Sequence, residues 1–229
     1  MPKSTIFRQT VVFPTTNYLL MGHSVQQFHE SGLLFSFPKD WQVLKYDAHP
    51  YFRAISGAGM RGADFIWVDS AGVLTLMEVK HFRQPSQPGI DAPDLLPPPA
   101  ELAEAVGRKM ADTLMGIQVV EGYLSRKWTF RVWRRLAQLI GKRAPQMGEW
   151  MVWQNLHRAG EVHRPKRIVL WLEIPGCEIT QRYTASVREV FAPFLRDQLP
   201  DFSLECEISS SHEIPESLSG IQAIHRDEQ

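Results

Sequence analysis

The chain has 229 residues, of which 44% are hydrophobic and 22% are charged, and its formal net charge is zero. This composition is ordinary for a folded globular protein, and it excludes a largely disordered chain or one coated in basic charge. The length fits a single domain, residues 1–229, that can bury a sizeable core.

Charge is unevenly distributed along the chain. Seven Lys or Arg and no acid lie from Arg126 to Arg143, whereas seven acids and one Arg lie from Asp201 to Gln229. This asymmetry indicates a localised surface that binds anions.

Cysteine content and hydropathy bear on the compartment. Two cysteines, Cys177 and Cys206, are too few for a disulfide framework and lack the spacing of metal ligands. No stretch approaches the ~20 apolar residues that cross a membrane. The N-terminal sequence also lacks the apolar run and cleavage pattern of a signal peptide. We therefore expect a cytoplasmic protein with no membrane partner.

The first predicted elements precede residue 60. Residues 22–32 are compatible with a helix that has Glu30 near its end and is closed by Gly32. A strand is expected within residues 35–47, after Pro38.

Residues 62–82 are predicted to form a β-hairpin. Two apolar runs flank the sequence Asp69-Ser70-Ala71-Gly72. Asp is favoured at the first position of a type I turn, and Gly at the fourth closes a three-residue hairpin loop. This turn chemistry makes Asp69 pair with Val73.

Counting outward from that pair brings three charged side chains together at one end of the hairpin. Asp64 falls directly opposite Glu78, and Lys80 shares the face of Glu78 because side chains alternate along a strand. The hairpin is otherwise apolar on both faces, and burying charges in such surroundings is costly.

A proline-rich insertion, residues 84–99, separates this hairpin from two predicted helices. The first helix begins at Ala100 and presents one apolar side. That side is formed by Leu102, Val106, Met110, Leu114, Ile117 and Leu124.

The second predicted helix spans residues 127–140. Its apolar stripe includes Trp128 and Val132. Basic residues flank or follow it: Arg131, Arg134, Arg135, Lys142 and Arg143. They form either a solvated face of a packed helix or a surface that contacts a nucleic-acid backbone.

The remaining elements complete an α/β pattern. Residues 167–173 are predicted to form an internal strand, Ser186 to start a short helix that Pro193 kinks or divides, and residues 202–209 to form an edge strand. Residues 211–229 are expected to form a loosely ordered tail.

The whole is predicted to be one α/β domain with a mixed sheet flanked by helices. We place its core at about residues 22–175 and a helix–strand extension at 184–210.

Two carboxylates that face each other across a strand pair repel, so one must shift its pKa or both must bind a cation. A hard divalent cation, Mg²⁺ or Mn²⁺, prefers oxygen ligands and resolves the conflict. A water that the metal activates is a nucleophile for phosphodiester hydrolysis, and Lys80 can orient it or steady the negative charge on the phosphate.

Asp64, followed after thirteen residues by Glu78-Val79-Lys80, resembles the D…(D/E)-x-K signature of the PD-(D/E)xK nuclease superfamily. The resemblance covers mainly residues 22–123 and is greatest to the nuclease-related-domain and the restriction- or repair-type branches. It implies a restriction-endonuclease-like fold with a helix–three-strand–helix–strand core.

The resemblance also implies a site and a substrate. Asp64, Glu78 and Val79 would ligate the metal, Lys80 would be the catalytic lysine, and Glu30 would join them from the preceding helix. The implied substrate is nucleic acid, DNA rather than RNA, cleaved in restriction, repair or defence by a homodimer or within a larger complex.

Other interpretations remain open from the residues alone. Asp64, Glu78 and Lys80 could form an exposed salt bridge at a strand end, which contributes little stability. Glu30 could be a solvated helix residue, and His81 is the one histidine near enough to the motif to be tested. The chain could also be a non-catalytic nucleic-acid-binding or assembly subunit that keeps a nuclease fold.

Overall fold

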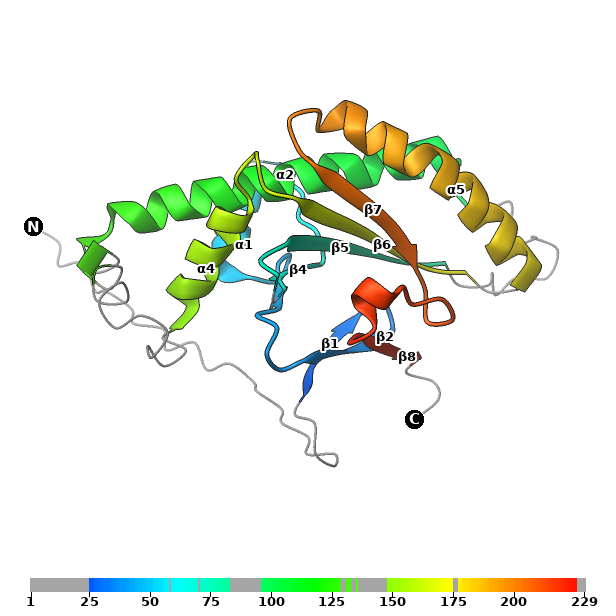
Figure 1. Ribbon diagram of the computed structural model, residues 1–229, viewed down its shortest axis with the longest axis horizontal. Coiled ribbons are helices and arrows are strands. Elements are labelled where there is room, and N and C mark those ends of the chain that lie inside the picture. Colours follow the sequence, from blue (N-terminus) through cyan, green and yellow to red (C-terminus); the bar gives the residue numbers. More distant parts are fainter. Residues whose placement is uncertain are drawn as a thin grey trace, which may run out of the picture.

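The computed structural model describes residues 25–57, 59–69, 71–82, 96–128, 131–132, 135, 148–174 and 177–225. These residues form an α/β structure with a mixed five-stranded sheet, a three-stranded antiparallel sheet and four α-helices (Figure 1). In chain order the elements are β1 (Val25–Glu30), β2 (Leu33–Pro38), β3 (Leu44–Lys45), α1 (Pro50–Ser56), β4 (Phe65–Val68), β5 (Leu74–His81), α2 (Pro99–Arg126), α4 (Gly148–Ala159), β6 (Lys166–Glu173), α5 (Cys177–Gln198), β7 (Leu204–Ser209), the 3-10 helix η3 (Glu216–Leu218) and β8 (Gln222–His225).

The five-stranded sheet has the strand order β3-β4-β5-β6-β7. The first three strands are antiparallel neighbours, whereas β5, β6 and β7 run parallel. A parallel connection needs a crossover, and α2 with α4 and then α5 lie in the chain between these strands. As predicted, β6 is internal and β7 lies at the sheet edge.

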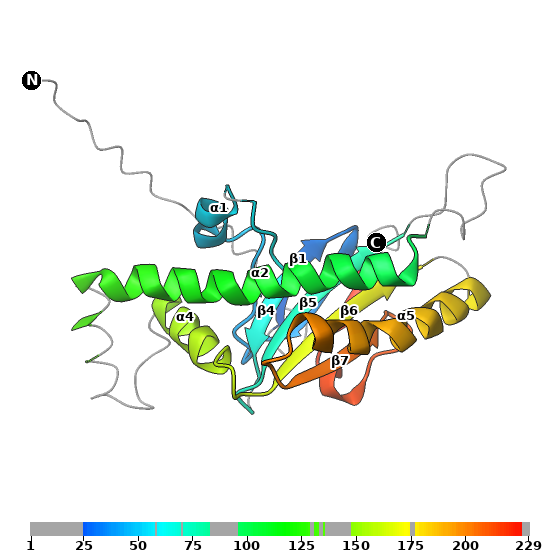
Figure 2. The same ribbon diagram turned by 90° about the horizontal axis from the view of Figure 1, so that it is seen from above.

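Two apolar cores lie on opposite faces of this sheet. On one face, even-numbered strand residues such as Leu76 and Leu170 pack with α2, α4 and α5. On the other face, odd-numbered strand residues such as Met77 and Trp171 pack with the three-stranded sheet. Figure 1 shows this sheet of β1, β2 and β8 on the side away from α2 and α5, and Figure 2 shows those two helices side by side across the strands. The molecule therefore has three layers, and its central strands are covered on both faces.

The β4–β5 hairpin has the predicted register. Phe65 pairs with Met77 and Val68 with Leu74, so Asp64 falls opposite Glu78 in the same count. The Asp69 N–H donates to the Val73 carbonyl at 3.1 Å, and Gly72 closes the turn with a positive φ of 81°. The Asp69 carboxylate accepts from the Ala71 and Val73 N–H groups, which fixes the length of the loop.

The helix predicted from Ala100 is confirmed as α2, and its apolar stripe is buried. Gly116 is required within this helix, because a Cβ there would overlap the Tyr46 hydroxyl. Glycine lowers intrinsic helix propensity, but here it lets the helix approach the residues that precede β4.

The helix predicted over residues 22–32 is wrong. Those residues instead include β1, which pairs with β2 in an antiparallel hairpin. Ser31 and Gly32 form its two-residue turn with positive φ values of 52° and 83°, the geometry of a type I′ turn. Of the strand expected after Pro38 within residues 35–47, the structure has only the two-residue β3, and β2 ends at Pro38.

The C-terminal part is more ordered than expected. The helix predicted to start at Ser186 begins nine residues earlier as α5 and continues past Pro193. The predicted tail contains η3 and β8; Leu218 and Ile221 are buried in the second core, and β8 pairs with β2.

Parts of two predictions fall outside the described residues. Most of the predicted proline-rich insertion lies outside them. So do Arg134, Lys142 and Arg143 of the predicted basic segment. Within the basic segment Trp128 and Val132 are exposed, so they do not form a buried stripe. Among the helices that the structure describes, none is long and apolar enough to cross a membrane.

Candidate functional site

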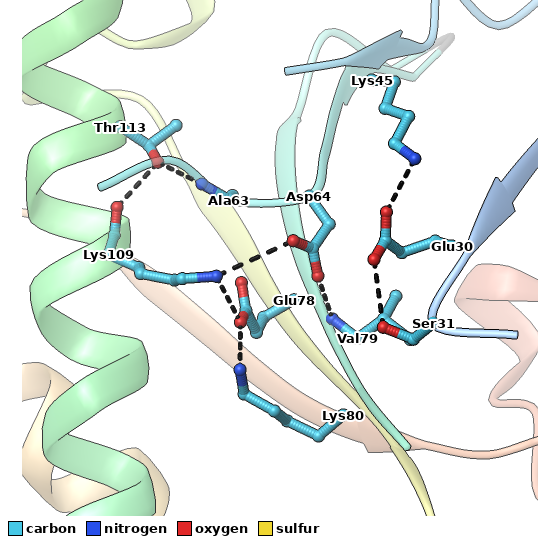
Figure 3. Close-up of polar contacts among 10 residues, drawn as sticks. All are labelled: Glu30, Ser31, Lys45, Ala63, Asp64, Glu78, Val79, Lys80, Lys109 and Thr113. Atoms are coloured by element: carbon cyan, nitrogen blue, oxygen red, sulfur yellow. Dashed lines mark hydrogen bonds and ion pairs between the residues drawn. The ribbon is translucent and has the colours of Figure 1, made fainter. Parts of the chain in front are cut away.

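Asp64, Glu78 and Lys80 converge on the helix-covered face of the five-stranded sheet, beside α2 (Figure 3). Asp64 immediately precedes β4, and two hydrogen bonds hold this entry to the sheet. The Ala63 N–H donates to Thr113 Oγ1 of α2 at 2.8 Å, and the Tyr46 N–H donates to the Asp64 carbonyl at 2.9 Å. Tyr46, which follows β3, and the long helix α2 therefore jointly fix the backbone that carries the Asp64 carboxylate.

Glu78 is completely buried, yet its two carboxylate oxygens have very different surroundings. Oε1 lies 2.6 Å from Lys80 Nζ and 2.6 Å from Lys109 Nζ. Oε2 is also buried and has no hydrogen-bond partner among the residues that the structure describes. An unpaired buried carboxylate oxygen is costly, so this atom marks a place where a ligand would be stabilised.

Asp64 is buried beside it. Its Oδ2 accepts a 2.7 Å hydrogen bond from the Val79 N–H, and its Oδ1 lies 3.7 Å from Lys109 Nζ. Burial raises the pKa of Asp64 to about 7; the charge of Glu78 adds to the rise, while Lys109 and the Val79 N–H oppose it. Near neutral pH this carboxylate can thus exchange a proton for another cation.

Lys109 of α2 completes the cluster, and the motif analysis missed it. Burial lowers the pKa of its ammonium, but Glu78 and Asp64 outweigh that effect and leave the pKa raised. The sequence does contain a weak signal for it. Lys109 and Thr113 are polar residues adjoining the apolar stripe of α2, at positions where such residues need partners.

A second group of acids adjoins Asp64. Glu30, Asp47 and Asp64 each offer a carboxylate oxygen, and these oxygens lie within 4.8 Å of one another. Burial raises the pKa of Asp47, and the charge of Glu30 contributes to the rise. Within the described part of the chain, the buried Oδ1 of Asp47 has no hydrogen-bond partner. Asp47 was not predicted from the sequence, because no motif connects it with Asp64.

Glu30 lies near the cluster, but from a different element than predicted. It ends β1 instead of a helix, and its carboxylate pairs with Lys45 Nζ at 2.8 Å and accepts from Ser31 Oγ at 3.0 Å. Figure 3 shows Glu30 on the other side of Asp64 from Lys109.

His81 and the basic segment lie apart from these contacts. His81 alternates to the opposite face from Lys80, where its Nδ1 lies 2.7 Å from the Ser31 carbonyl oxygen and its ring meets His225. Arg131 and Arg135 are exposed beyond the end of α2. Within the described residues, neither arginine has an ion pair or hydrogen bond with the acids.

No protein-family model, curated protein or solved structure matches this chain. The fold and the cluster therefore define the class by themselves: an α/β protein with buried carboxylates and two lysines at one end of a β-hairpin. Two neighbouring buried acids in contact with ammonium groups can ligate a metal or hold a structural ion pair.

Proposed function

We propose that this chain is a divalent-metal-dependent nuclease of the PD-(D/E)xK type, which hydrolyses phosphodiester bonds of DNA. One observation carries the proposal. The Asp, Glu and Lys of the motif lie together at one end of the β4–β5 hairpin, and Glu78, though completely buried, has an oxygen with no hydrogen-bond partner among the described residues.

The residues present fit a hard cation such as Mg²⁺ or Mn²⁺, because every group that could ligate it is an oxygen donor. Asp64 and Glu78, with the peptide group of Val79 beside them, would hold the ion. Glu30 and Asp47 add carboxylate oxygens near Asp64. A bound divalent cation would supply an activated water and positive charge at the phosphate.

Lys80 is the proposed catalytic lysine. Its side chain is 32% exposed, so its ammonium is held by the buried Glu78 and still reaches solvent. A substrate phosphate can approach such a group, and its positive charge would stabilise the charge that develops as the phosphodiester bond breaks. Glu78 keeps the ammonium in place.

The topology supports a restriction-endonuclease-like core. Glu78 lies on β5 and Asp64 immediately precedes its antiparallel neighbour β4, and the helical segment with α2 and α4 then leads to β6, which is parallel to β5, as that fold requires. One feature differs from the expected helix–three-strand–helix–strand order, because α1 lies between β3 and β4 instead of before them.

Under the same proposal, the protein is cytoplasmic and acts in restriction, repair or defence, as a homodimer or in a larger complex. The basic segment that contains Arg131 and Arg135 would contact the DNA backbone. Arg134, Lys142 and Arg143 belong to the same sequence segment.

The experiment is a digestion panel with purified protein. We expect plasmid and linear DNA to be cut with Mg²⁺ or Mn²⁺ and to stay intact with EDTA. Glu78→Ala and Lys80→Ala should abolish cutting, whereas Glu104→Gln, a change on the exposed part of α2, should not. Cutting that persists in both motif variants would reveal a contaminant or another site.

One observation favours the alternative, a non-catalytic nucleic-acid-binding or assembly subunit. Two lysines already balance the charges of Asp64 and Glu78, as they would in a structural ion-pair cluster. DNA binding without cutting under any metal, unchanged by Glu78→Ala, would establish this alternative over the nuclease.

A further inference from the structure

Lys109 occupies the position that a cation between the two motif acids would need. Its Nζ lies 2.6 Å from Glu78 Oε1 and 3.7 Å from Asp64 Oδ1. Among the described residues it is the one lysine whose ammonium contacts both acids, since Lys80 contacts Glu78 alone. Figure 3 shows the ammonium reaching from α2 toward both carboxylates.

The backbone that carries Lys109 is fixed, whereas its ammonium can move. The Lys109 carbonyl accepts a 2.7 Å hydrogen bond from Thr113 Oγ1, which also accepts from the Ala63 N–H next to Asp64. The side chain is 26% exposed, so it has a route to solvent. A flexible four-carbon stem lets an ammonium leave one partner for another without a backbone change.

We propose that Lys109 is a displaceable internal cation: its ammonium holds Asp64 and Glu78 together in the metal-free protein and leaves them when a divalent cation binds. This inference rests on the proposed metal site. Two cations that use the same carboxylates compete, so Lys109 lowers the affinity of the site for metal while it prevents the acids from repelling each other.

The first test measures Mn²⁺ binding by isothermal titration calorimetry at pH 8, with no nucleic acid present. Lys109→Gln should bind Mn²⁺ about tenfold more tightly than the wild type. A positive charge in contact with a carboxylate shifts the binding of another cation to that carboxylate by one or more powers of ten. Lys109→Arg, which keeps the charge, should stay near the wild type. Arg108→Gln, one residue away on α2 and paired with Glu104, is the matched control and should bind as the wild type does.

Thermal unfolding separates displacement from a purely structural ion pair. Without metal, Lys109→Gln should have a lower Tm than the wild type, and saturating Mn²⁺ should remove most of that deficit. A structural ion pair that metal does not displace would give the same deficit with and without Mn²⁺, which would overturn the inference.

Amine labelling of the wild type needs no variant and so does not depend on the folding of Lys109→Gln. Saturating Mn²⁺ should increase the rate at which an acylating reagent modifies Lys109, while the exposed Lys127 should not change. An unchanged rate for Lys109 at saturation would contradict displacement.

The outcomes distinguish this inference from the function it rests on. Equal Mn²⁺ affinities for the wild type and Lys109→Gln would overturn the role of Lys109 and leave the metal site intact. Absence of binding to every variant would overturn both.

Discussion

Two glutamates, Glu78 and Glu173, are buried on opposite faces of the same sheet. Glu78 lies on β5 and faces the helices, and Glu173 ends β6 and faces the three-stranded sheet. Glu173 is surrounded mainly by neutral donors. Its oxygens accept from Trp171 Nε1 at 2.9 Å and from the Ser211 N–H and hydroxyl, and His225 Nε2 lies 3.9 Å away.

The two environments differ in what they leave unpaired. Both oxygens of Glu173 have hydrogen-bond partners, so its burial is compensated locally, and it ties the turn at Ser211 to the sheet. Glu78 instead has two ammonium groups on one oxygen and, among the described residues, no partner on the other. Complete hydrogen bonding is typical of a structural carboxylate, whereas an unpaired oxygen beside two partly exposed ammonium groups favours a ligand site.

The largest expected effect separates these two glutamates by activity. Glu78→Gln removes a proposed metal ligand, so we expect the rate of DNA cleavage with Mg²⁺ to fall about a thousandfold, a typical loss when a key electrostatic group is removed. Glu173→Gln should cleave at close to the wild-type rate. Single-turnover cleavage of a labelled duplex measures both rates, and equal losses would abolish the distinction.

The second effect concerns the free-energy cost of burying the charged carboxylate of Asp64. Burial raises its pKa to about 7, far above the ~3.9 of an exposed Asp. Between these two values the folded protein holds a proton that the unfolded chain has lost, so the contribution of Asp64 to stability falls as the pH rises through this window.

Asp64→Asn removes that cost. At ~1.4 kcal/mol per unit of pKa shift, the variant in EDTA at pH 8 should be more stable than the wild type by up to about 4 kcal/mol. Near pH 4 the difference in stability should almost vanish. Urea unfolding at the two pH values measures the difference. A stability difference that does not depend on pH would show that Asp64 is not strained.

A third effect should appear in stability alone. Glu173→Ala leaves the indole N–H of Trp171 and the N–H of Ser211 without their acceptor, and it should lower the free energy of unfolding by about 2–3 kcal/mol. Glu173→Gln keeps an acceptor and should cost less. A Glu173→Ala protein as stable as the wild type would mean that these bonds contribute little.

The comparison also shows how far the sequence could predict the site. The β4–β5 hairpin was predictable because Asp69 and Gly72 set the loop length, and the loop length sets which residues face each other. Lys109 and Asp47 were not, because they reach Asp64 from separate elements that only the tertiary fold brings together.

The errors in the fold have a similar physical origin. Val25 and Phe28 are three residues apart, which fits a helical period and not an alternating one, whereas pairing with β2 makes residues 25–30 a strand with Val25 exposed and Phe28 half-buried. The strand β8 likewise depends on β2 for a partner, so the isolated sequence around Leu218 and Ile221 predicts only a loosely ordered tail. Local turn chemistry was therefore a better guide than short apolar patterns.

The smallest expected effect tests whether DNA lies along the basic segment that follows α2. Changing Arg131 and Arg135 to Gln together should reduce the slope of log K against log salt by about 2, because each lost phosphate contact removes ~0.9 of a released counterion. Arg182 and Arg196, both exposed on α5, provide the matched double variant, which should keep the wild-type slope. Fluorescence anisotropy of a labelled duplex across a range of KCl concentrations measures the slope. If both double variants lost the same slope, the binding would reflect overall charge, and the basic segment would lose its proposed role while the cleavage chemistry at Glu78 would stand unaffected.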